Sequence, residues 1–462
     1  MTLGLCPAPR EVYSVRVTLN WNPRPATAAA VGFLGLIAIG TVILSTPWAS
    51  ATGRAAFLDA LFTATSASCL TGLITVDTAT AWSPFGQSVI MVLIQLGGLG
   101  FMTMTCLLSI ALGARLGLRR RLGAQAEGRG ADLGDVRWIV RATLSFTLAV
   151  EAIIFIALTL RFHSSYGYDW QRAAWEGLFH AVSSFNNAGF ALYTDNVIRF
   201  ATDALILLPL AFGVIVGGLG FPVLLETYRR FASRKPIRRR WSLTALFTWT
   251  GTAILVVTGT VLVAVSEWDG VLADFDGPYR LLNAFFAGIS PRTAGFNAID
   301  YAQAHPQTLV ATDFLMFIGG GSGGTAGGIK ITTVAVLLAA IGAEIKGRRT
   351  ATAHGRSINR RVVRQALAVT AAAVILVLGS TYLILGMAPQ FTSDQILFET
   401  TSAFGTVGLS TGITAGLPRD AQFILIVLMF AGRVGPLALA TTLAGRVTTR
   451  LYEYPEERPA IG

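Results

Sequence analysis

Charged side chains are scarce in this sequence: they make up 13% of its 462 residues, whereas 53% are hydrophobic. A soluble globule of this length needs far more polar surface than such a composition supplies. The sequence therefore predicts a polytopic membrane protein and excludes an ordinary soluble domain.

Cysteine and histidine are also rare, with three and four residues. Cys6, Cys69 and Cys106 are scattered along the chain, so they offer neither a disulfide framework nor paired metal-ligand spacing. The histidines are dispersed, and acids and histidines do not cluster as a membrane-embedded enzyme would need. These absences argue against a metalloenzyme and predict that the chain is not an enzyme.

The net charge of +11 is distributed unevenly. Arginine and lysine concentrate in three loops between apolar runs, at 114–137, 232–240 and 344–361. By the positive-inside rule these loops are cytoplasmic, and the segments midway between them face the outside. Nucleic-acid binding is the other interpretation of basic runs, but these runs flank membrane spans and lack interleaved aromatic residues.

One short pattern occurs four times along the chain. Its copies are S-A-S-C-L-T-G-L at 66–73, S-S-F-N-N-A-G-F at 183–190, I-S-P-R-T-A-G-F at 289–296 and S-A-F-G-T-V-G-L at 402–409. In every copy a glycine precedes leucine or phenylalanine, and another phenylalanine lies ten residues before that glycine. Four copies in register indicate a repeat, with units of roughly one hundred residues.

Each copy follows a short apolar segment and lies between two long ones. The long runs are 27–47, 84–113, 138–161, 204–231, 241–266, 307–343, 362–388 and 420–445. A helix needs about 20 residues to cross a bilayer. The short segments, near 57–69, 172–185, 278–290 and 394–404, must therefore enter the membrane and return, which is tolerated only where protein or a water-filled cavity satisfies the backbone.

The predicted fold is an all-α polytopic membrane protein with four pseudo-fourfold units around one central pore. Each unit is a span, a short pore helix, a filter loop and a second span, and both termini are cytoplasmic. The predicted divisions are an N-terminal segment (1–26), pore unit 1 (27–113), a basic loop (114–137), pore unit 2 (138–231), a basic loop (232–240), pore unit 3 (241–343), a basic loop (344–361), pore unit 4 (362–445) and a C-terminal tail (446–462).

The repeated loops have the chemistry of a cation site. A cation that enters a narrow passage loses its hydration shell, and carbonyls of an extended loop can replace those oxygens if a glycine provides the required conformation. The pore helices would point their partly negative C-terminal ends at this ring. The predicted filter residues are Leu70, Thr71, Gly72, Asn187, Ala188, Gly189, Thr293, Ala294, Gly295, Thr406, Val407 and Gly408.

Three acids follow the glycines and would form a negative outer mouth that concentrates cations: Asp77, Asp195 and Asp300. Ordinary glycine turns are the plainer interpretation of the repeated pattern. They would account for one copy, but much less well for four aligned copies.

The second spans of units 3 and 4 contain residues that are unusual within a membrane: a glycine run and an arginine. Glycine costs about 1 kcal/mol per residue within a helix, so the run at 317–330 should unwind the third unit's second span. This run does not fit a phosphate-binding P-loop, because Lys330 is followed by isoleucine. Arg433 lies within the fourth unit's second span, where it would repel a passing cation or cap loop carbonyls, and both roles are compatible. Glu151 is the other intramembrane charge, expected to be a buried partner or a snorkelling acid.

The motifs T-G-L, N-N-A-G-F, T-A-G-F and T-V-G-L, each behind a short pore helix, resemble the four filter loops of the Trk/Ktr/HKT superfamily of potassium transporters. The resemblance covers nearly the whole chain. It is strongest to the KtrB branch, the membrane subunits of Ktr uptake systems, since the sequence has no extra pair of N-terminal spans. In plant HKT relatives a serine at the first filter position accompanies sodium selectivity, whereas all four positions here are glycine, which favours potassium.

The resemblance implies a homodimer in the cytoplasmic membrane, regulated by a cytosolic, KtrA-like nucleotide-binding ring. It also implies an intramembrane gate below the filter. The gate residues carried over are Gly319, Gly320, Gly321, Ser322, Gly323, Gly324, Thr325, Ala326, Gly327, Gly328, Lys330 and Arg433.

The predicted function is potassium uptake through a selective, gated pore, driven by the membrane potential. The chain itself needs no cofactor, and potassium is its substrate. Sodium as an activator, and a sodium-selective or potassium/sodium-coupled transporter of the same fold, stay open as alternatives.

Overall fold

The structure is a computed structural model that describes residues 25–115, 133–232 and 241–445. The predicted C-terminal tail, the loop 233–240 and most of the segments 1–26 and 114–137 lie outside these residues. The regular secondary structure of the described residues is helical apart from one small hairpin, formed by β1 (Thr352–Ala353) and β2 (Arg356–Ser357).

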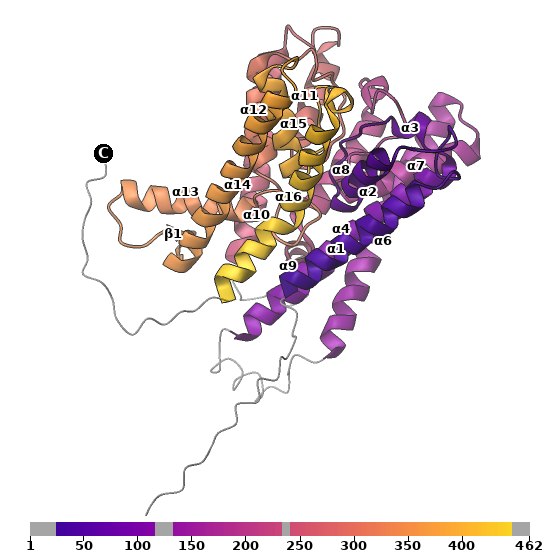
Figure 1. Ribbon diagram of the computed structural model, residues 1–462. Coiled ribbons are helices and arrows are strands. Elements are labelled where there is room, and N and C mark those ends of the chain that lie inside the picture. Colours follow the sequence, from indigo (N-terminus) through magenta and orange to yellow (C-terminus); the bar gives the residue numbers. More distant parts are fainter. Residues whose placement is uncertain (1–24, 116–132, 233–240, 446–462) are drawn as a thin grey trace, which may run out of the picture.

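Four units follow one another with the same order of elements. Unit 1 has α1 (Pro25–Leu44), α2 (Phe57–Cys69), α3 (Thr78–Ala81) and α4 (Pro84–Arg115); unit 2 has α6 (Leu133–Tyr166), α7 (Trp170–Phe185), η1 (Ile198–Phe200), α8 (Ala204–Leu219) and α9 (Phe221–Ala232); unit 3 has α10 (Leu243–Glu267), α11 (Gly277–Ile289), α12 (Pro306–Phe317) and α13 (Ile331–Ile345); unit 4 has α14 (Arg360–Met387), α15 (Ser393–Gly405), η2 (Thr414–Gly416) and α16 (Arg419–Gly445). The short helices α2, α7, α11 and α15 are the predicted pore helices, and Figure 1 shows them in the upper half of the molecule.

Four helices of the described chain are each long and apolar enough to cross a membrane, and they are the first spans of the four units: α1, α6, α10 and α14. The bent pair of α8 and α9 would make a fifth. The second spans of units 1 and 4, α4 and α16, are continuous helices, whereas those of units 2 and 3 are broken. The sequence predicted the break in unit 3, but the expectation of an unbroken second span in unit 2 is wrong.

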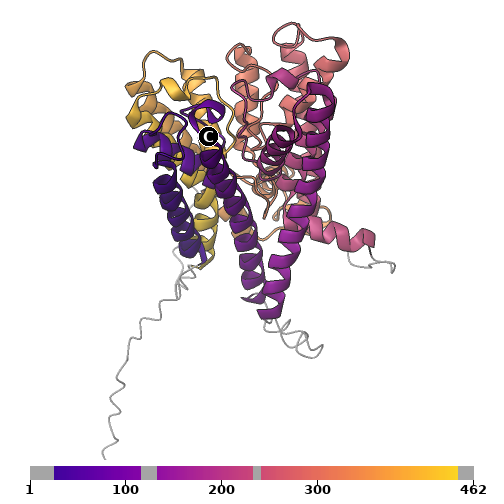
Figure 2. The same cartoon turned by 90° about the vertical axis from the view of Figure 1, so that its right-hand side faces the viewer.

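The expected span 204–231 bends by 98° between α8 and α9, so that α9 lies across the long helices (Figure 2). Gly220, at the bend, has a φ of +91°. A Cβ on this glycine would lie 2.8 Å from the Gly324 nitrogen and from the Ser322 oxygen. The bend therefore occurs where the backbone of unit 3 packs against unit 2, a contact that the local sequence does not reveal.

The predicted unwinding of unit 3 is confirmed, because α12 ends at Phe317 and α13 begins only at Ile331. Figure 1 shows α13 lying crosswise at the side of the bundle. The segment after it, expected to be a basic loop, contains the hairpin of β1 and β2. Ala351 and Ile358 flank this hairpin and pack with Phe247 of α10, so this part of the loop is ordered against the bundle.

Contacts between neighbouring units close the bundle into a ring. In each unit the second span packs against the pore helix of the next: α4 against α7, α8 against α11, α12 against α15, and α16 against α2. The last of these contacts joins the end of the described chain to its beginning. The four pore helices are therefore held in one cyclic arrangement.

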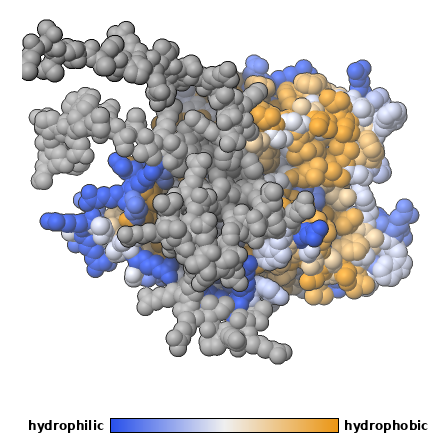
Figure 3. Space-filling view, turned by 90° about the horizontal axis from the view of Figure 1, so that it is seen from below, coloured by the Kyte–Doolittle hydropathy of each residue, from blue (hydrophilic) through white to orange (hydrophobic). Residues whose placement is uncertain are grey.

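The outside of the bundle is apolar. Large aliphatic side chains of the first spans are exposed, for example Val42 at 68%, Ile254 at 63% and Ile375 at 71%. Figure 3, seen from below, shows a broad hydrophobic area on the right, the side on which Figure 1 draws α1 and α6. Buried polar residues are meanwhile frequent in the pore helices. Apolar outside and polar inside is the arrangement of a multi-pass membrane protein.

Candidate functional site

The four repeated glycines meet in a closed ring. A Cβ on Gly72 would lie 2.5 Å from the Ala188 oxygen, one on Gly189 would lie 2.9 Å from the Ala294 oxygen, and one on Gly295 would lie 2.5 Å from the Val407 oxygen. A Cβ on Gly408 would meet the Thr71 oxygen, which completes the cycle. At each glycine, the space of a side chain is thus filled by the carbonyl that precedes the next glycine.

The backbone of the ring is the same in all four loops. The glycines have φ values of +91°, +70°, +71° and +93° in chain order, a region that favours glycine. Two residues earlier, Leu70, Asn187, Thr293 and Thr406 are also left-handed, with φ between +49° and +63°. The four loops therefore have equivalent conformations around one centre.

Hydrogen bonds tie each loop to its own pore helix. The residue before each glycine donates its N–H to a serine carbonyl: Thr71 to Ser66 at 2.8 Å, Ala188 to Ser183 at 2.8 Å, Ala294 to Ser290 at 3.0 Å and Val407 to Ser402 at 2.8 Å. The predicted filter residues other than glycine are at most 1% exposed. The structure thus brings all the predicted filter residues together at the C-terminal ends of the four pore helices.

The hydroxyls of these serines were missed as loop anchors. Ser66 and Ser402 each accept the N–H of their loop glycine at 3.0 Å. Ser183 donates to the Phe190 carbonyl at 2.8 Å, and Ser290 donates to the Phe296 carbonyl. The sequence pattern that could have revealed these anchors is present in three units, where a serine stands six residues before the glycine. In unit 3 that position is Ile289, and the serine follows it.

Glycines of the second spans allow the pore helices to approach closely. A Cβ on Gly97 would meet the Ser68 carbonyl, one on Gly217 the Phe185 carbonyl, and one on Gly432 the Phe404 carbonyl. Each of these carbonyls lies near the C-terminal end of a pore helix. These three glycines therefore serve close packing between helices.

The glycine-rich loop of unit 3 lies between units 2 and 4. On one side, Gly321 donates its N–H to the Gly218 oxygen at 2.8 Å, and Thr325 donates its N–H to the Gly217 oxygen at 3.1 Å. On the other side, a Cβ on Gly327 would collide with the side chain of Thr406. The predicted gate residues thus touch a filter residue of unit 4 and the broken span of unit 2.

Two cationic side chains approach consecutive carbonyls of this loop. Arg433, only 1% exposed, donates to the Thr325 carbonyl. The ammonium of Lys330 donates to the Ala326 carbonyl at 2.5 Å and to the Gly327 carbonyl at 3.5 Å. The expectation that Arg433 caps loop carbonyls is therefore met, and its role as a barrier stays a prediction.

A direct link between filter and gate was not predicted. The Thr325 hydroxyl donates to the side-chain oxygen of Asn187 at 3.0 Å. The amide nitrogen of Asn187 donates to the Arg292 carbonyl at 3.3 Å. One filter residue of unit 2 therefore contacts both the gate loop and the neighbouring filter loop of unit 3.

The three predicted outer-mouth acids are each engaged in hydrogen bonds. Asp77 accepts from Thr194 of the neighbouring loop at 2.7 Å. Asp195 pairs with Arg199 at 2.6 Å, which offsets its charge. Asp300 accepts from Ala302 and Gln303 of its own loop.

Of the two roles expected for Glu151, the structure shows a buried hydrogen-bonding partner and not a snorkelling acid. Its carboxylate accepts from Asn186 at 3.0 Å and from Gln95 at 3.2 Å. Asn186 also donates to the Gln95 side chain at 2.8 Å. This buried cluster joins α4 and α6 to the residue that directly follows pore helix α7.

Replacing Asn186 with leucine should destabilise the protein by about 1–3 kcal/mol, because the buried acceptors of Glu151 and Gln95 would lose their donor. The thermal unfolding midpoint of the detergent-purified protein measures this effect. Gln303→Ala is the control, since it removes one exposed hydrogen bond to Asp300. An Asn186→Leu midpoint equal to that of the control would contradict the prediction.

Known proteins are similar to this chain over almost its full length. The family described as "TrkH: Cation transport protein" matches residues 27–448. The Ktr system potassium uptake protein B of Bacillus subtilis is 38% identical over 94% of this chain and 95% of its own length. The potassium/sodium uptake protein NtpJ of Enterococcus hirae is 37% identical over 95% of this chain and 97% of its own length.

A solved structure has the same fold. The potassium transporter TrkH from Vibrio parahaemolyticus superposes with a TM-score of 0.71 over 92% of this chain and 86% of its own, at 18% identity. The pseudo-fourfold arrangement of pore helices agrees with that fold, and the matching family consists of transport proteins rather than enzymes. The chain therefore belongs to the TrkH family of cation transport proteins.

Proposed function

We propose that this protein is a potassium uptake pore whose selectivity filter is the ring of four glycine loops. The observation that carries the proposal is the closed cycle of Gly72, Gly189, Gly295 and Gly408, each against the carbonyl that precedes the next glycine. Carbonyl oxygens in such a ring replace the hydration shell of a cation. The naming of the B. subtilis relative as a potassium uptake protein supports potassium as the substrate.

This chain would supply no energy for transport, and the membrane potential would drive the flux. A cation that crosses gains about 2.3 kcal/mol per 100 mV of membrane potential, which is sufficient to drive uptake into a cell with a negative interior. Asp77, Asp195 and Asp300 would form the outer mouth. We assign no cofactor to the chain, potassium is its substrate, and sodium is the candidate activator.

The loop of unit 3 would be the gate. Gly319 to Gly328 contact the filter residue Thr406 and are held by Arg433 and Lys330. Passage then requires this loop and its cationic anchors to move aside. A guanidinium held at this place would also repel a cation that leaves the filter.

The setting would be the cytoplasmic membrane, with both termini inside. A homodimer and a cytosolic nucleotide-binding ring of the KtrA type are the proposed partners. The name of the B. subtilis relative, a lettered protein of a "Ktr system", is consistent with a multi-component assembly. The basic segments at 114–137, 232–240 and 344–361 would face this ring or acidic lipid headgroups.

The second candidate is a sodium-selective or potassium/sodium-coupled transporter. The naming of the E. hirae relative as a potassium/sodium uptake protein, at 37% identity, favours keeping it. Both candidates use the same pore, and they differ in which cation the ring accepts and in whether sodium crosses together with potassium.

Potassium uptake in cells that lack their own potassium transporters tests the proposal. Wild-type protein, with a cognate regulatory subunit supplied, should restore growth at limiting potassium. Gly72→Ser should weaken this rescue or turn it toward sodium, because its Cβ would lie 2.5 Å from the Ala188 carbonyl. Rescue that is absent, or indifferent to Gly72, would overturn the filter assignment, and uptake that follows sodium alone would favour the second candidate.

A further inference from the structure

Pore helix α15 carries a buried acid that the filter and the gate do not use. Glu399 is 0% exposed and lies nine residues before the ring glycine Gly408. Its carboxylate contacts the segment that leaves the filter, which runs from Gly408 toward η2. It is therefore placed behind the outer end of the fourth filter loop.

The groups around Glu399 can stabilise an ionised carboxylate, whereas burial alone favours the neutral acid. One oxygen accepts from the Ser410 hydroxyl at 2.5 Å and from the Thr411 N–H at 3.2 Å. The other accepts from the Thr414 hydroxyl at 2.8 Å. Ser410 in turn accepts the N–H of Gly412 at 2.8 Å, so its own proton is available for the carboxylate. All three donors are neutral, and three donated hydrogen bonds stabilise the charged form.

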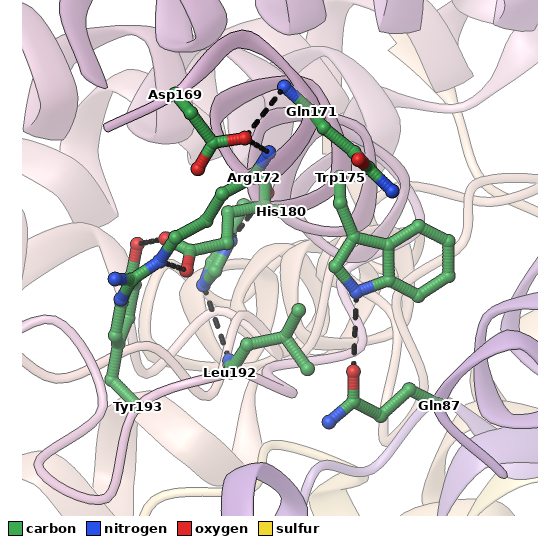
Figure 4. Close-up of polar contacts among 9 residues, drawn as sticks. Gln87, Asp169, Gln171, Arg172, Trp175, His180, Leu192 and Tyr193 are labelled. Atoms are coloured by element: carbon green, nitrogen blue, oxygen red, sulfur yellow. Dashed lines mark hydrogen bonds and ion pairs between the residues drawn. The ribbon is translucent and has the colours of Figure 1, made fainter. Parts of the chain in front are cut away.

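The equivalent position in unit 2 holds a neutral group. His180 lies nine residues before Gly189, and its Nε2 accepts the N–H of Leu192 at 3.4 Å. Its Nδ1 lies 2.7 Å from the Glu176 carbonyl and donates to it, so one nitrogen donates and the other accepts, as in a neutral ring. Figure 4 shows His180 reaching Leu192. Leu192 and Thr411 are both the third residue after their glycine, so the same contact is made by an imidazole in one unit and by a carboxylate in the other.

The charge of Glu399 is not balanced by an ion pair within the described residues. The acid of pore helix α7, Glu176, is paired with Arg172 at 2.8 Å. In unit 1, Asp59 accepts from Thr75 at 2.8 Å but is half-buried, so water screens its charge. When ionised, Glu399 is thus a fully buried negative charge next to a filter loop, where screening by solvent is weakest, and a cation in the ring would offset this charge.

We propose that Glu399 is a specificity-determining residue of the pore: its buried negative charge stabilises a monovalent cation at the outer end of the filter, while its hydrogen bonds hold the fourth loop. This inference rests on the proposed function, since it needs a cation in the ring. An attraction of about 1.4 kcal/mol between this charge and the ion would raise the ion's occupancy about tenfold.

The test is the concentration dependence of potassium (or rubidium) uptake in transporter-deficient cells. Glu399→Gln removes the charge but keeps an oxygen that accepts from Ser410 and Thr411. We expect its KM for potassium to rise about tenfold, with the maximal rate at saturating potassium nearly unchanged. Loss of the fold would instead lower the maximal rate and the amount of protein in the membrane, which is measured in parallel.

Glu267→Gln is the matched control. Glu267 is also 0% exposed and accepts hydrogen bonds from Val271, His305 and Thr308, but it contacts no filter loop. Its carboxylate also lies 3.0 Å from the His305 Nδ1. Its substitution should leave the KM for potassium within about twofold of wild type, because none of its hydrogen bonds comes from a filter loop.

Glu399→His is a second neutral variant, which places in unit 4 the residue that unit 2 has at the equivalent position. It should raise the KM for potassium as Glu399→Gln does. A KM unchanged in whichever of these neutral variants reaches the membrane, or an equal rise in Glu267→Gln, overturns the inference. If the wild-type chain itself carries no monovalent cation, the proposed function fails first, and the two failures are therefore distinguishable.

Discussion

Gly408→Ala should abolish useful potassium uptake, with the maximal rate falling by about a hundredfold for a barrier raised by roughly 3 kcal/mol. The left-handed backbone of Gly408, with φ at +93°, costs an alanine about 1–2 kcal/mol. Its Cβ would also meet the Thr71 carbonyl and lie 2.9 Å from the Gly72 Cα. Overpacking of this kind costs about 1–3 kcal/mol, and here it would displace an oxygen that binds the ion.

Gly412→Ala separates these two causes. Gly412 lies in the same loop with a φ of +86°, but no atom lies within 4 Å of the place that a Cβ would take. Its alanine variant bears the same backbone strain without touching the ring, so uptake should stay within about threefold of wild type. Measured rates would contradict the ring if Gly412→Ala were as damaging as Gly408→Ala, because strain alone would then explain the loss.

Arg433→Gln should raise potassium uptake at low external potassium by tenfold or more. If the guanidinium stands about 5 Å from the ion, it opposes the ion's passage by about 3 kcal/mol at an effective dielectric near 20. Glutamine removes this charge but keeps an N–H donor for the Thr325 carbonyl, which Arg433 now caps. The expected result is a pore that conducts more and depends less on its regulator, measured as initial uptake rate with and without the regulatory subunit.

Arg433→Lys is the control for this prediction, because it keeps the positive charge while changing the shape of the donor. It should conduct no faster than wild type. If the glutamine variant is slower than wild type, or if both variants are faster, the residue acts by holding the loop and not as an electrostatic barrier.

The pore helices and the ring glycines were predictable because local features decide them. Segments such as Phe57–Cys69 are too short to cross a membrane, and the repeated glycines mark positions that other residues rarely adopt. The unwinding between Phe317 and Ile331 was predictable for the same reason, since many glycines together weaken a helix wherever they occur.

Features that depend on distant segments were not predictable. A single glycine costs a helix only about 1 kcal/mol, so the presence of Gly220 in the sequence is not enough to predict a bend of 98°. The bend depends on the backbone of unit 3, more than one hundred residues later. The partners of Glu151 and the contact between Asn187 and Thr325 likewise join units that sequence reasoning treats separately.

The gate loop comes from only one of the four units, and this decides whether such a pore can be built from identical subunits. The loop of unit 3 fills the space between Gly217 of unit 2 and Thr406 of unit 4. Four identical subunits would each offer the same loop to this space, and the copies would exclude one another. A single chain with fused repeats escapes this conflict, because each repeat can diverge on its own. Broken symmetry is here a requirement of the gate, and the fusion of the four repeats is what permits it.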